Sequence, residues 1–186
     1  MEKYVHHLTD FAHRIKVGED EYVQTDNIKG FSLPDIEPGT NEISGYSGLN
    51  GTLTVMDWAN IQAMEMSLKF STIPEKTQIM KPGKQQHQIV WTEQYEDKEQ
   101  NTGWMTFKAY ITANLKKTPG GDYSKGETGE REFTYAVKAY RLVRINEAAD
   151  GTVTEEELIN YDPVNKKLVL GGDNIGEKMT KPTASF

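Results

Sequence analysis

The sequence predicts a mainly β protein: an antiparallel β-sandwich or barrel-forming subunit with one short flanking helix and long assembly loops. Three observations support this fold class. Apolar and polar residues alternate with a period of two between residues 57 and 145, as on strands with one buried face. The alternating segments are longer than the ordinary strand of about 5–6 residues. Only one segment has a convincing helix start, and 186 residues suffice for a single domain with its own core.

The N-terminal third has weaker strand patterns. Strands are expected over Phe11–Val17, Glu21–Gln24 and Gly30–Leu33. The segment Asp35–Asn50 that follows is rich in glycine, proline, asparagine and serine, and it is long for a plain connection in a compact domain. Residues 35–50 are therefore expected to form a long assembly loop.

Four longer alternating segments come next. They are expected to be strands over Met64–Phe70, His87–Glu96, Trp104–Lys116 and Phe133–Ile145. On the third, the odd-numbered residues from Met105 to Leu115 are apolar, and the residues between them are polar except for Tyr110. On the fourth, Tyr140 and Leu142 add apolar area to the second face. We therefore expect that strand to pack against a helix or a neighbouring subunit on that side.

The remaining elements are a helix, a second long loop and a C-terminal arm. The segment Ser71–Glu75 contains capping residues followed by a proline in the first turn, so a short helix is expected over Pro74–Met80. Thr118–Gly129 contains four glycines and is expected to be a long loop. A last strand is expected over Glu156–Tyr161. Residues 1–170 are then one β domain, and Gly171–Phe186, which has no periodic pattern, is an arm.

Composition excludes several classes of function. Lys and Arg number 21 against 28 Asp and Glu, a net charge of −7, which argues against a protein that grips nucleic acid or an anionic membrane. No cysteine is present, so disulfides, thiolate zinc sites and cysteine nucleophiles are excluded. No run of apolar residues has the length of a signal peptide or a membrane span, and we expect no membrane anchor.

One segment has some features of a calcium-binding loop. In Asn146–Glu157, Asp150-Gly151 and Glu157 stand at positions where such loops carry ligands or a turn. Ala148, however, occupies a position that normally supplies a carboxylate, and strand patterns flank the segment on both sides. A hairpin turn at Asp150-Gly151 is therefore the favoured interpretation.

Histidines and tryptophans are the other candidates for chemistry. His6, His7 and His13 do not have metal-ligand spacing, because adjacent residues on a strand point to opposite faces, so we expect exposed terminal histidines. Trp91 falls on an apolar strand face and is expected in the core. Trp58 and Trp104 remain candidates for stacking on a sugar.

Motifs for catalysis are absent from the sequence. The spacing Gly45-x-x-Gly48-x-x-Gly51 is followed by neither a Lys-Ser/Thr pair nor a helix, so it does not predict a phosphate-binding loop. The acidic cluster Glu93–Asp97 lies on a strand without a partner histidine. We therefore expect a protein without enzymatic activity, cofactor or bound metal.

The order of segments resembles the major tail tube protein of contractile-tailed bacteriophages and of phage-tail-like bacteriocins. The resemblance runs from Phe11 to Tyr161, and the C-terminal stretch Leu170–Ile175 departs from it. The segments that carry it are Gly30-Phe31-Ser32-Leu33-Pro34, the glycines from Gly45 to Gly51, Met64-Glu65-Met66-Ser67-Leu68-Lys69-Phe70, Asn114-Leu115-Lys116-Lys117 with the glycine-rich loop after it, and Ala139-Tyr140-Arg141-Leu142-Val143.

The resemblance implies a structural protein of a virion tail, a homo-oligomer assembled in the host cytoplasm. Its subunits would form hexameric rings whose strands join into a β-barrel, and the rings would stack into a hollow conduit for genome ejection. Partners implied are further copies, the tail sheath protein, baseplate and tail terminator proteins, and DNA that passes without specific binding. Contacts between subunits or rings are then expected at Leu33, Pro34, Ile36, Ile43, Tyr46 and Leu49, and lumen-facing positions at Thr106, Lys108, Thr112 and Asn114.

Two alternatives stay open on the sequence alone. The first is the inner tube of a phage-tail-like bacteriocin (tailocin) or of a contractile injection or secretion system, which differs from a phage tail in its cargo. The second belongs to another class, a carbohydrate-binding β-sandwich that uses Trp58 and Trp104.

Overall fold

The structure of the chain is a computed structural model that describes residues 5–17, 19, 21–44, 52–72, 77–96, 102–120, 129–147 and 151–176. Within these ranges it is mainly β and antiparallel, which confirms the predicted fold class. The elements are β1 (Val5–Val17), β2 (Glu21–Gln24), β3 (Ile28–Ser32), β4 (Pro38–Ser44), β5 (Thr52–Ile61), β6 (Glu65–Phe70), the 3₁₀ helix η1 (Thr77–Met80), β7 (Lys84–Glu96), β8 (Thr102–Lys117), β9 (Arg131–Glu147), β10 (Val153–Asp162), β11 (Lys167–Leu170) and β12 (Asp173–Asn174).

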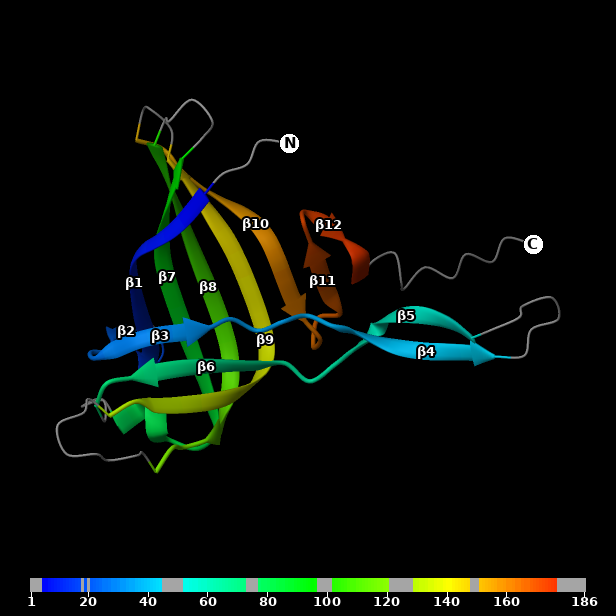
Figure 1. Cartoon of the computed structure of the whole chain (residues 1–186), viewed down its shortest axis with the longest axis horizontal. Helices are drawn as coiled ribbons and strands as arrows, with labels where there is room; N and C mark the ends of the chain where they lie inside the picture. Colours follow the sequence, from blue (N-terminus) through cyan, green and yellow to red (C-terminus); the bar gives the residue numbers. More distant parts are fainter. Residues whose placement is uncertain are drawn as a thin grey trace.

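Ten of these strands form one antiparallel sheet that folds back on itself (Figure 1). The main path runs β12-β11-β10-β9-β8-β7-β1-β2. The first half of β9 pairs with β6, which in turn pairs with β3, while the second half of β9 pairs with β10. Because β9 belongs to both parts, β3 and β6 lie across the long strands, and the core forms between these two layers.

The core is built from the apolar face that alternation predicts. Met66, Leu68 and Phe70 of β6 are buried, and Ile89, Trp91, Ala109, Ile111 and Ala113 meet them from β7 and β8. The apolar residues of β8 are the odd-numbered ones expected from the sequence. Aromatic rings bridge the layers: Phe31 packs on Trp91 with ring centroids 5.4 Å apart, and Trp91 stacks on Phe107 at the same distance.

A β-bulge in β9 corrects the prediction for that strand. In the ladder with β8, Thr112 is opposite Ala139 but Ala113 is opposite Val137, so Lys138 is an extra residue. An extra residue reverses the alternation beyond it. Tyr140 and Leu142 therefore point to the same core as the residues before the bulge. The apolar area that predicted a helix or another subunit on the second face belongs to the chain's own core.

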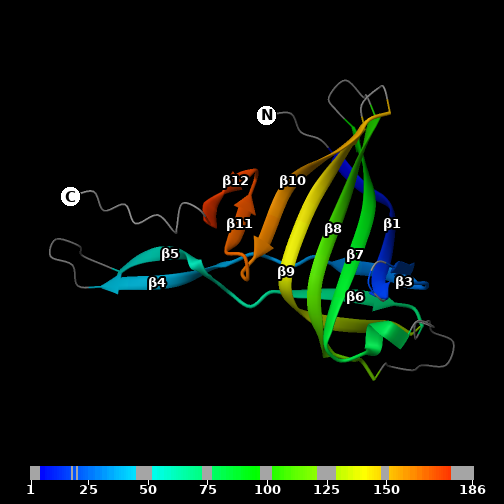
Figure 2. The ribbon, with the colours of Figure 1, turned by 180° about the vertical axis from the view of Figure 1, so that it is seen from behind.

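The segment expected as a long loop, residues 35–50, in part forms a strand. Its residues 38–44 are β4, which pairs with β5 in a separate two-stranded sheet that extends away from the main sheet (Figure 2). Gly39 allows this pairing, since a Cβ there would lie 2.9 Å from the backbone oxygen of Asn60. The glycine, proline and asparagine residues that made this segment resemble a loop lie here in a strand, whose ladder is irregular between Pro38 and Gly39.

Helix and C-terminus also differ from expectation. The described part of the predicted helix is the 3₁₀ turn η1, held where Tyr135 Oη donates to the carbonyl of Ile79 at 3.2 Å. Gly171 and Gly172 have positive φ values of 60° and 86°, which form the turn between β11 and β12. The β domain thus continues past residue 170, and only residues 177–186 of the expected arm lie outside the described residues, as do residues 121–128 of the loop predicted over 118–129.

Candidate functional site

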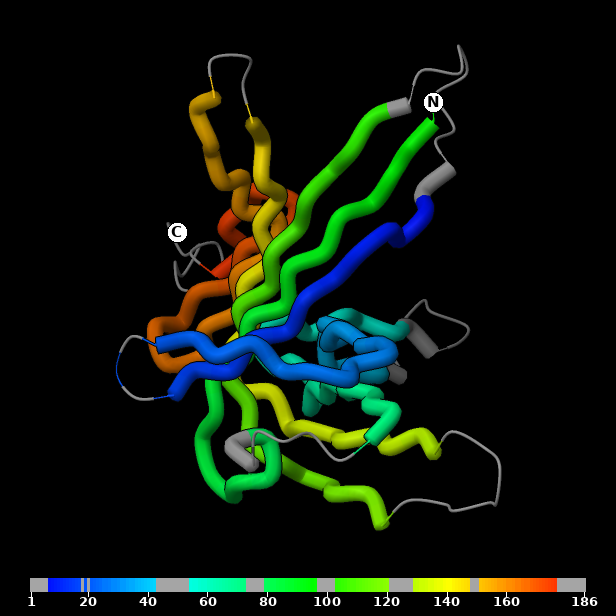
Figure 3. Tube along the Cα trace, turned by 90° about the vertical axis from the view of Figure 1, so that its left-hand side faces the viewer, coloured from blue at the N-terminus to red at the C-terminus, as the bar shows by residue number. Residues whose placement is uncertain are grey.

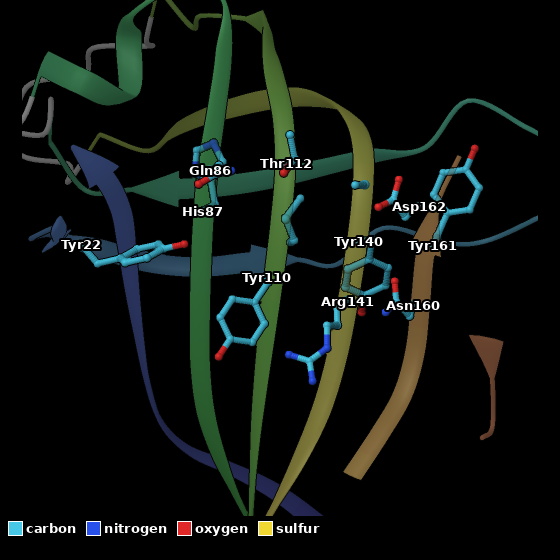
Figure 4. A pocket seen from close by; sticks show the side chains of 12 residues that line it. Tyr22, Gln86, His87, Tyr110, Thr112, Tyr140, Arg141, Asn160, Tyr161 and Asp162 are labelled. Carbon is cyan, nitrogen blue, oxygen red and sulfur yellow. The ribbon is translucent and has the colours of Figure 1, made fainter. Parts of the chain in front are cut away.

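The residues predicted to face a lumen lie along β8, on the side of the sheet opposite the core. We call this side the polar face. One row of it, set by strand register, runs Arg14, Gln88, Tyr110, Arg141 and Asn160 across five strands. Figure 4 shows Tyr110, Arg141 and Asn160 of this row on neighbouring strands, with Thr112 beside them. Thr106, Lys108 and Thr112 share this face with Tyr110, as the period of two requires.

Asn114 is set apart from the other three lumen candidates. It lies beyond the bulge, where β8 pairs with the first half of β9 and Asn114 is opposite Ala136. Its side-chain oxygen Oδ1 is buried without a hydrogen-bond partner among the described residues. The sheet bends at this point. Alternation along β8 alone therefore does not predict which residues surround Asn114.

An ionic cluster fills the β9–β11 side of the polar face. Glu157 accepts hydrogen bonds from Arg141 Nε at 2.9 Å, Lys167 Nζ at 3.0 Å and Asn160 Nδ2 at 2.8 Å. Burial alone would raise the pKa of Glu157, but these three donors outweigh it and lower the pKa to about 2. Arg141 also bonds Glu155 at 3.2 Å. The carboxylates of β10 thus neutralise the cations of β9 and β11.

Tyr110 stands in the middle of the polar face, where the alternation of β8 placed its ring. The Lys108 ammonium lies 4.8 Å from the centre of the ring, and the Arg141 guanidinium lies 5.5 Å from it. Both are within the range of a cation–π contact. The hydroxyl of Tyr110 also donates to Glu155 at 3.4 Å. Lys108 therefore lies against the sheet and is partly buried.

Two of the long strands of the main sheet, β1 and β10, each have an open edge over part of their length. Pairing of β1 with β2 begins only at Arg14, and pairing of β10 with β11 begins only at Ile159. In the described part of the chain, residues 5–12 and 153–157 therefore have a strand partner on one side only. In Figure 3, β1 (blue) runs beside β7 (green) on one side of the long strands, and β10 (orange) lies on the other side. Unpaired backbone groups along a strand edge are a ready surface for another strand.

The β4–β5 hairpin is the other exposed feature. At its base, Asp57 accepts a hydrogen bond from the backbone N–H of Ala59 at 3.0 Å and holds a bend in β5. Further out, Val55 and Met56 are 39% and 56% exposed. The hairpin makes its ladder within itself, and it projects from the body as a two-stranded arm.

The predicted interface residues divide between the body and this hairpin. Leu33 and Ile36 pack in part against the chain's own core, and Pro34 is buried. Ile43 lies on β4 opposite Leu53. Tyr46 and Leu49 lie outside the described residues.

Buried histidines are the feature that sequence reasoning missed. The expectation of exposed histidines is wrong for His13, which is fully buried on β1 and lies 3.0 Å from His87 of β7. His7 is exposed, as expected. His13 is on the core face of β1, and its alternation with Phe11 and Ile15 was the signal available. Among the described residues, no group of three or more potential ligands is arranged to hold a metal ion.

The tryptophans and the hairpin turn can also be placed. Trp91 is in the core, as predicted. Trp104 is 60% exposed on β8, whereas Trp58 lies on β5 in the separate two-stranded sheet, so the two rings are not on neighbouring strands. β9 and β10 are antiparallel neighbours, as the hairpin interpretation of Asp150-Gly151 requires, although Asp150 itself lies outside the described residues. In the described ranges no helix is long and apolar enough to cross a membrane.

Comparison with known proteins gives the family. Among solved structures, the chain is similar to chains of an extracellular contractile injection system: one from the PVC sheath–tube complex in its extended state, with 16% identity and a TM-score of 0.46 over 71% of this chain and 86% of that one, and one from the sheath/tube terminator, with the same identity, TM-score and coverage of this chain and 91% of that one. It is also similar to a type six secretion system protein, with 10% identity and a TM-score of 0.45 over 86% of this chain and 100% of that one.

Sequence comparison is more decisive than these distant likenesses. No curated protein matches the chain significantly. The family model for the phage tail tube protein FII matches residues 14–181, which is most of the sequence and all of the main sheet from Arg14 onward. The chain therefore belongs to the phage tail tube protein FII family and is a structural component of a tail particle.

Proposed function

We propose that this chain is a non-enzymatic tube subunit of a contractile phage tail, and that its copies form hexameric rings that stack into a hollow conduit for DNA ejection through the host envelope. The observation that carries the proposal is the pair of open edges on one continuous sheet. The edges of β1 and β10 are different, so a joint between them is heterologous and repeats around a ring. Such a joint gives strand partners to backbone groups that a lone subunit leaves to water.

In this proposal the polar face lines the lumen, with Thr106, Lys108 and Thr112 on it and Asn114 at the bend. The carboxylates of Glu155 and Glu157 already form ion pairs with Arg141 of β9 and Lys167 of β11. DNA phosphates that pass this part of the face therefore meet few free cations to replace their counterions. This arrangement favours passage of DNA over specific binding.

The β4–β5 hairpin is proposed to contact the next subunit or ring. Ile43 lies on β4 of this hairpin, and Leu33, Pro34 and Ile36 lead into it along the core. Tyr46 and Leu49, which lie outside the described residues, are proposed as contacts on the sequence resemblance alone. Exposed apolar side chains of the hairpin, such as Met56 opposite Thr40, support this role because a contact would remove them from water.

The remaining partners follow from the proposed tube. A tail sheath protein would surround it, baseplate and tail terminator proteins would bind its two ends, and assembly would take place in the host cytoplasm. The same architecture without a genome would serve a bacteriocin or a protein-injecting system. Neighbouring genes discriminate between them, since capsid and terminase genes accompany a true phage.

Two adjacent proline substitutions test the edge joint. Successive N–H groups of a strand point to opposite edges, so of Thr154→Pro and Glu155→Pro one removes an N–H that faces β9 and the other an outward N–H. The variant that loses the outward N–H should keep the circular dichroism and melting temperature of the parent. It should fail to form rings or tubes in negative-stain electron microscopy and remain a monomer by light scattering. If the variant that loses the outward N–H folds normally and still forms tubes, the proposed pairing of β10 with another subunit is refuted.

A further inference from the structure

A pair of buried histidines joins the edge of the main sheet to its centre. His13 of β1 and His87 of β7 are 0% and 1% exposed, and His13 Nε2 lies 3.0 Å from His87 Nδ1. On its other side, His13 Nδ1 lies 2.7 Å from Thr25 Oγ1, directly after β2. The backbone N–H of Thr25 donates to the carbonyl of His13 at 3.0 Å. The cluster thus ties β1, the end of β2 and β7 together at one point.

Among the residues that the structure describes, no charged group shares the buried space around the pair. The buried side chains on the same face of β1, β7 and β8 and on η1 are uncharged: Ile15, Ile89, Ile111 and Ile79, and the amide of Gln85, which donates to the carbonyl of Ile79 at 3.3 Å. The titratable group that faces it is Tyr135 of β9, whose ring centre lies 4.7 Å from that of His87. Burial raises the pKa of Tyr135, so its hydroxyl stays neutral. Arg14, Lys84 and Lys108 of the same strands alternate to the polar face, and Asp26, next to Thr25, is exposed.

Hydrogen bonding in the cluster can be completed only with both rings neutral. His87 Nδ1–H then donates to His13 Nε2, and His13 Nδ1–H donates to Thr25 Oγ1. The Thr25 hydroxyl in turn donates to the carbonyl of His13 at 3.3 Å. Every donor has an acceptor, and only the lone pair of His87 Nε2, which is buried without a partner, is left over. Unpaired buried acceptors are tolerated better than unpaired buried donors.

A proton added to either ring breaks this arrangement. On His13 it would set an N–H against the N–H of His87 across 3.0 Å or, if His87 moves its proton to Nε2, bury that N–H without an acceptor. On His87 it would also bury the Nε2–H without an acceptor among the described residues. The added charge would also lie in an apolar space without a counter-ion. In the closed cluster both histidines therefore stay neutral under acidic conditions in which each would bind a proton in water.

We propose that His13, His87 and Thr25 form an acid-sensitive latch, whose protonation releases β1 and β2 from β7 while the sheet from β7 to β10 stays folded. The elements that it releases are at the end of the sheet order, so they can leave without breaking the inner ladders. Burial lowers the pKa of His13 to about 3, and burial followed by repulsion from His13 places that of His87 well below its usual value.

The sign of the pH dependence follows from these directions. Both folded-state pKa values lie below the ordinary value of about 6.5, so the open state binds more protons than the closed one. The latch is fully closed above pH 6.5 and weakens as the pH falls. At pH 5.0, one histidine released into water should raise the opening constant about 30-fold over neutral pH, and two should raise it about 1,000-fold.

Hydrogen exchange of the whole chain, followed by mass spectrometry at pH 7.5 and 5.0 and corrected for intrinsic rates, tests the latch. Peptides of β1 and β2 should open about 1,000-fold more at pH 5.0, while peptides of β8 and β9 keep their protection. Unchanged protection of β1 and β2 at pH 5.0 would overturn the proposal. Equal loss across all strands would do the same, because it would show global unfolding.

Two histidine variants sharpen the test. His87→Asn keeps a hydrogen-bonding group near the Nδ1 position but removes one titratable ring, so the acid response should fall to about 30-fold. His7→Asn removes an exposed histidine of the same strand and should leave the response unchanged. If His87→Asn does not fold, NMR titration of the unchanged chain decides the question. Ring signals of the two buried histidines that stay neutral down to pH 5.5 support the latch, and titration near pH 6.5 refutes it.

Discussion

Glu157 joins three elements on the polar face by hydrogen bonds and charge. Its carboxylate takes donors from Arg141 of β9, Lys167 of β11 and Asn160 of its own strand. The side chain is 25% exposed, so each contact is partly screened by water. What the cluster supplies is a fixed position for β11, which otherwise pairs with β10 over four residues.

Glu157→Gln should lower the free energy of unfolding at pH 7 by about 1 kcal/mol or less, because the pairs are partly exposed. The folded-state pKa of about 2 lies below that of an unfolded glutamate, so this contribution is present above about pH 4.5 and is lost as the pH falls towards 2. Urea unfolding at pH 7 and pH 2.5 checks this, with exposed Glu147→Gln as the matched control. An equal difference from the parent at both pH values would contradict the assignment.

At the scale of the element, β9 decides the fold. Its first half pairs with β6 and its second half with β10, and the bulge at Lys138 lets both halves direct apolar side chains into one core. Phe133 and Tyr135 enter the core before the bulge, and Tyr140 enters it afterwards. Without the extra residue, one of these halves would face the wrong side of the sheet.

Deletion of Lys138 should therefore be severe although the side chain is exposed. It would turn either Phe133 and Tyr135 or Tyr140 away from the core, and the loss of one large buried side chain costs about 3–5 kcal/mol. Lys138→Ala keeps the bulge and should cost no more than about 0.5 kcal/mol. Thermal unfolding of the two variants compares them. A deletion variant as stable as the alanine variant would show that the bulge does not set the register.

Strand positions were predictable from sequence to the extent that alternation is regular. β8 has a clear period of two, and its buried residues are the predicted ones. β9 has an interrupted period, and sequence alone cannot distinguish a bulge from a strand buried on both faces. β4 was missed because Gly39 and Pro38 are typical of loops, whereas here they lie in a two-stranded hairpin whose ladder tolerates them.

The candidate site was predictable only in part, for a similar reason. Thr106, Lys108 and Thr112 share a face because alternation is local information. The contact of His13 with His87 joins residues 74 positions apart, and no local pattern gives the register of β1 on β7 that brings them together. The ionic cluster around Glu157 likewise depends on the pairing of three strands.

Viewed as a whole, the molecule has a folded body and a projecting hairpin. The body contains the core and the open edges, while the β4–β5 hairpin leaves it where Gln62 N–H donates to the carbonyl of Glu37 at 2.9 Å. Because the hairpin's ladder is internal, its outer part contributes little to the core. An isolated two-stranded hairpin is marginally stable in water, so a chain that keeps one exposed is consistent with a partner that covers it.

Shortening the hairpin separates its role in assembly from folding. Replacing residues 42–54 by Asn-Gly retains Asn41 opposite Val55 and closes the ladder with a tight turn. The melting temperature should stay within a few degrees of the parent, because Glu42 and Thr54, which begin and end the removed segment, are exposed. Since the open edges of β1 and β10 are intact, rings should still form, but they should not stack into tubes in electron micrographs. A lighter variant, Met56→Glu, should weaken stacking, whereas Val164→Glu, at an 88% exposed position in the β10–β11 turn, should not. Full-length tubes from the shortened chain would place the contact between rings elsewhere on the body.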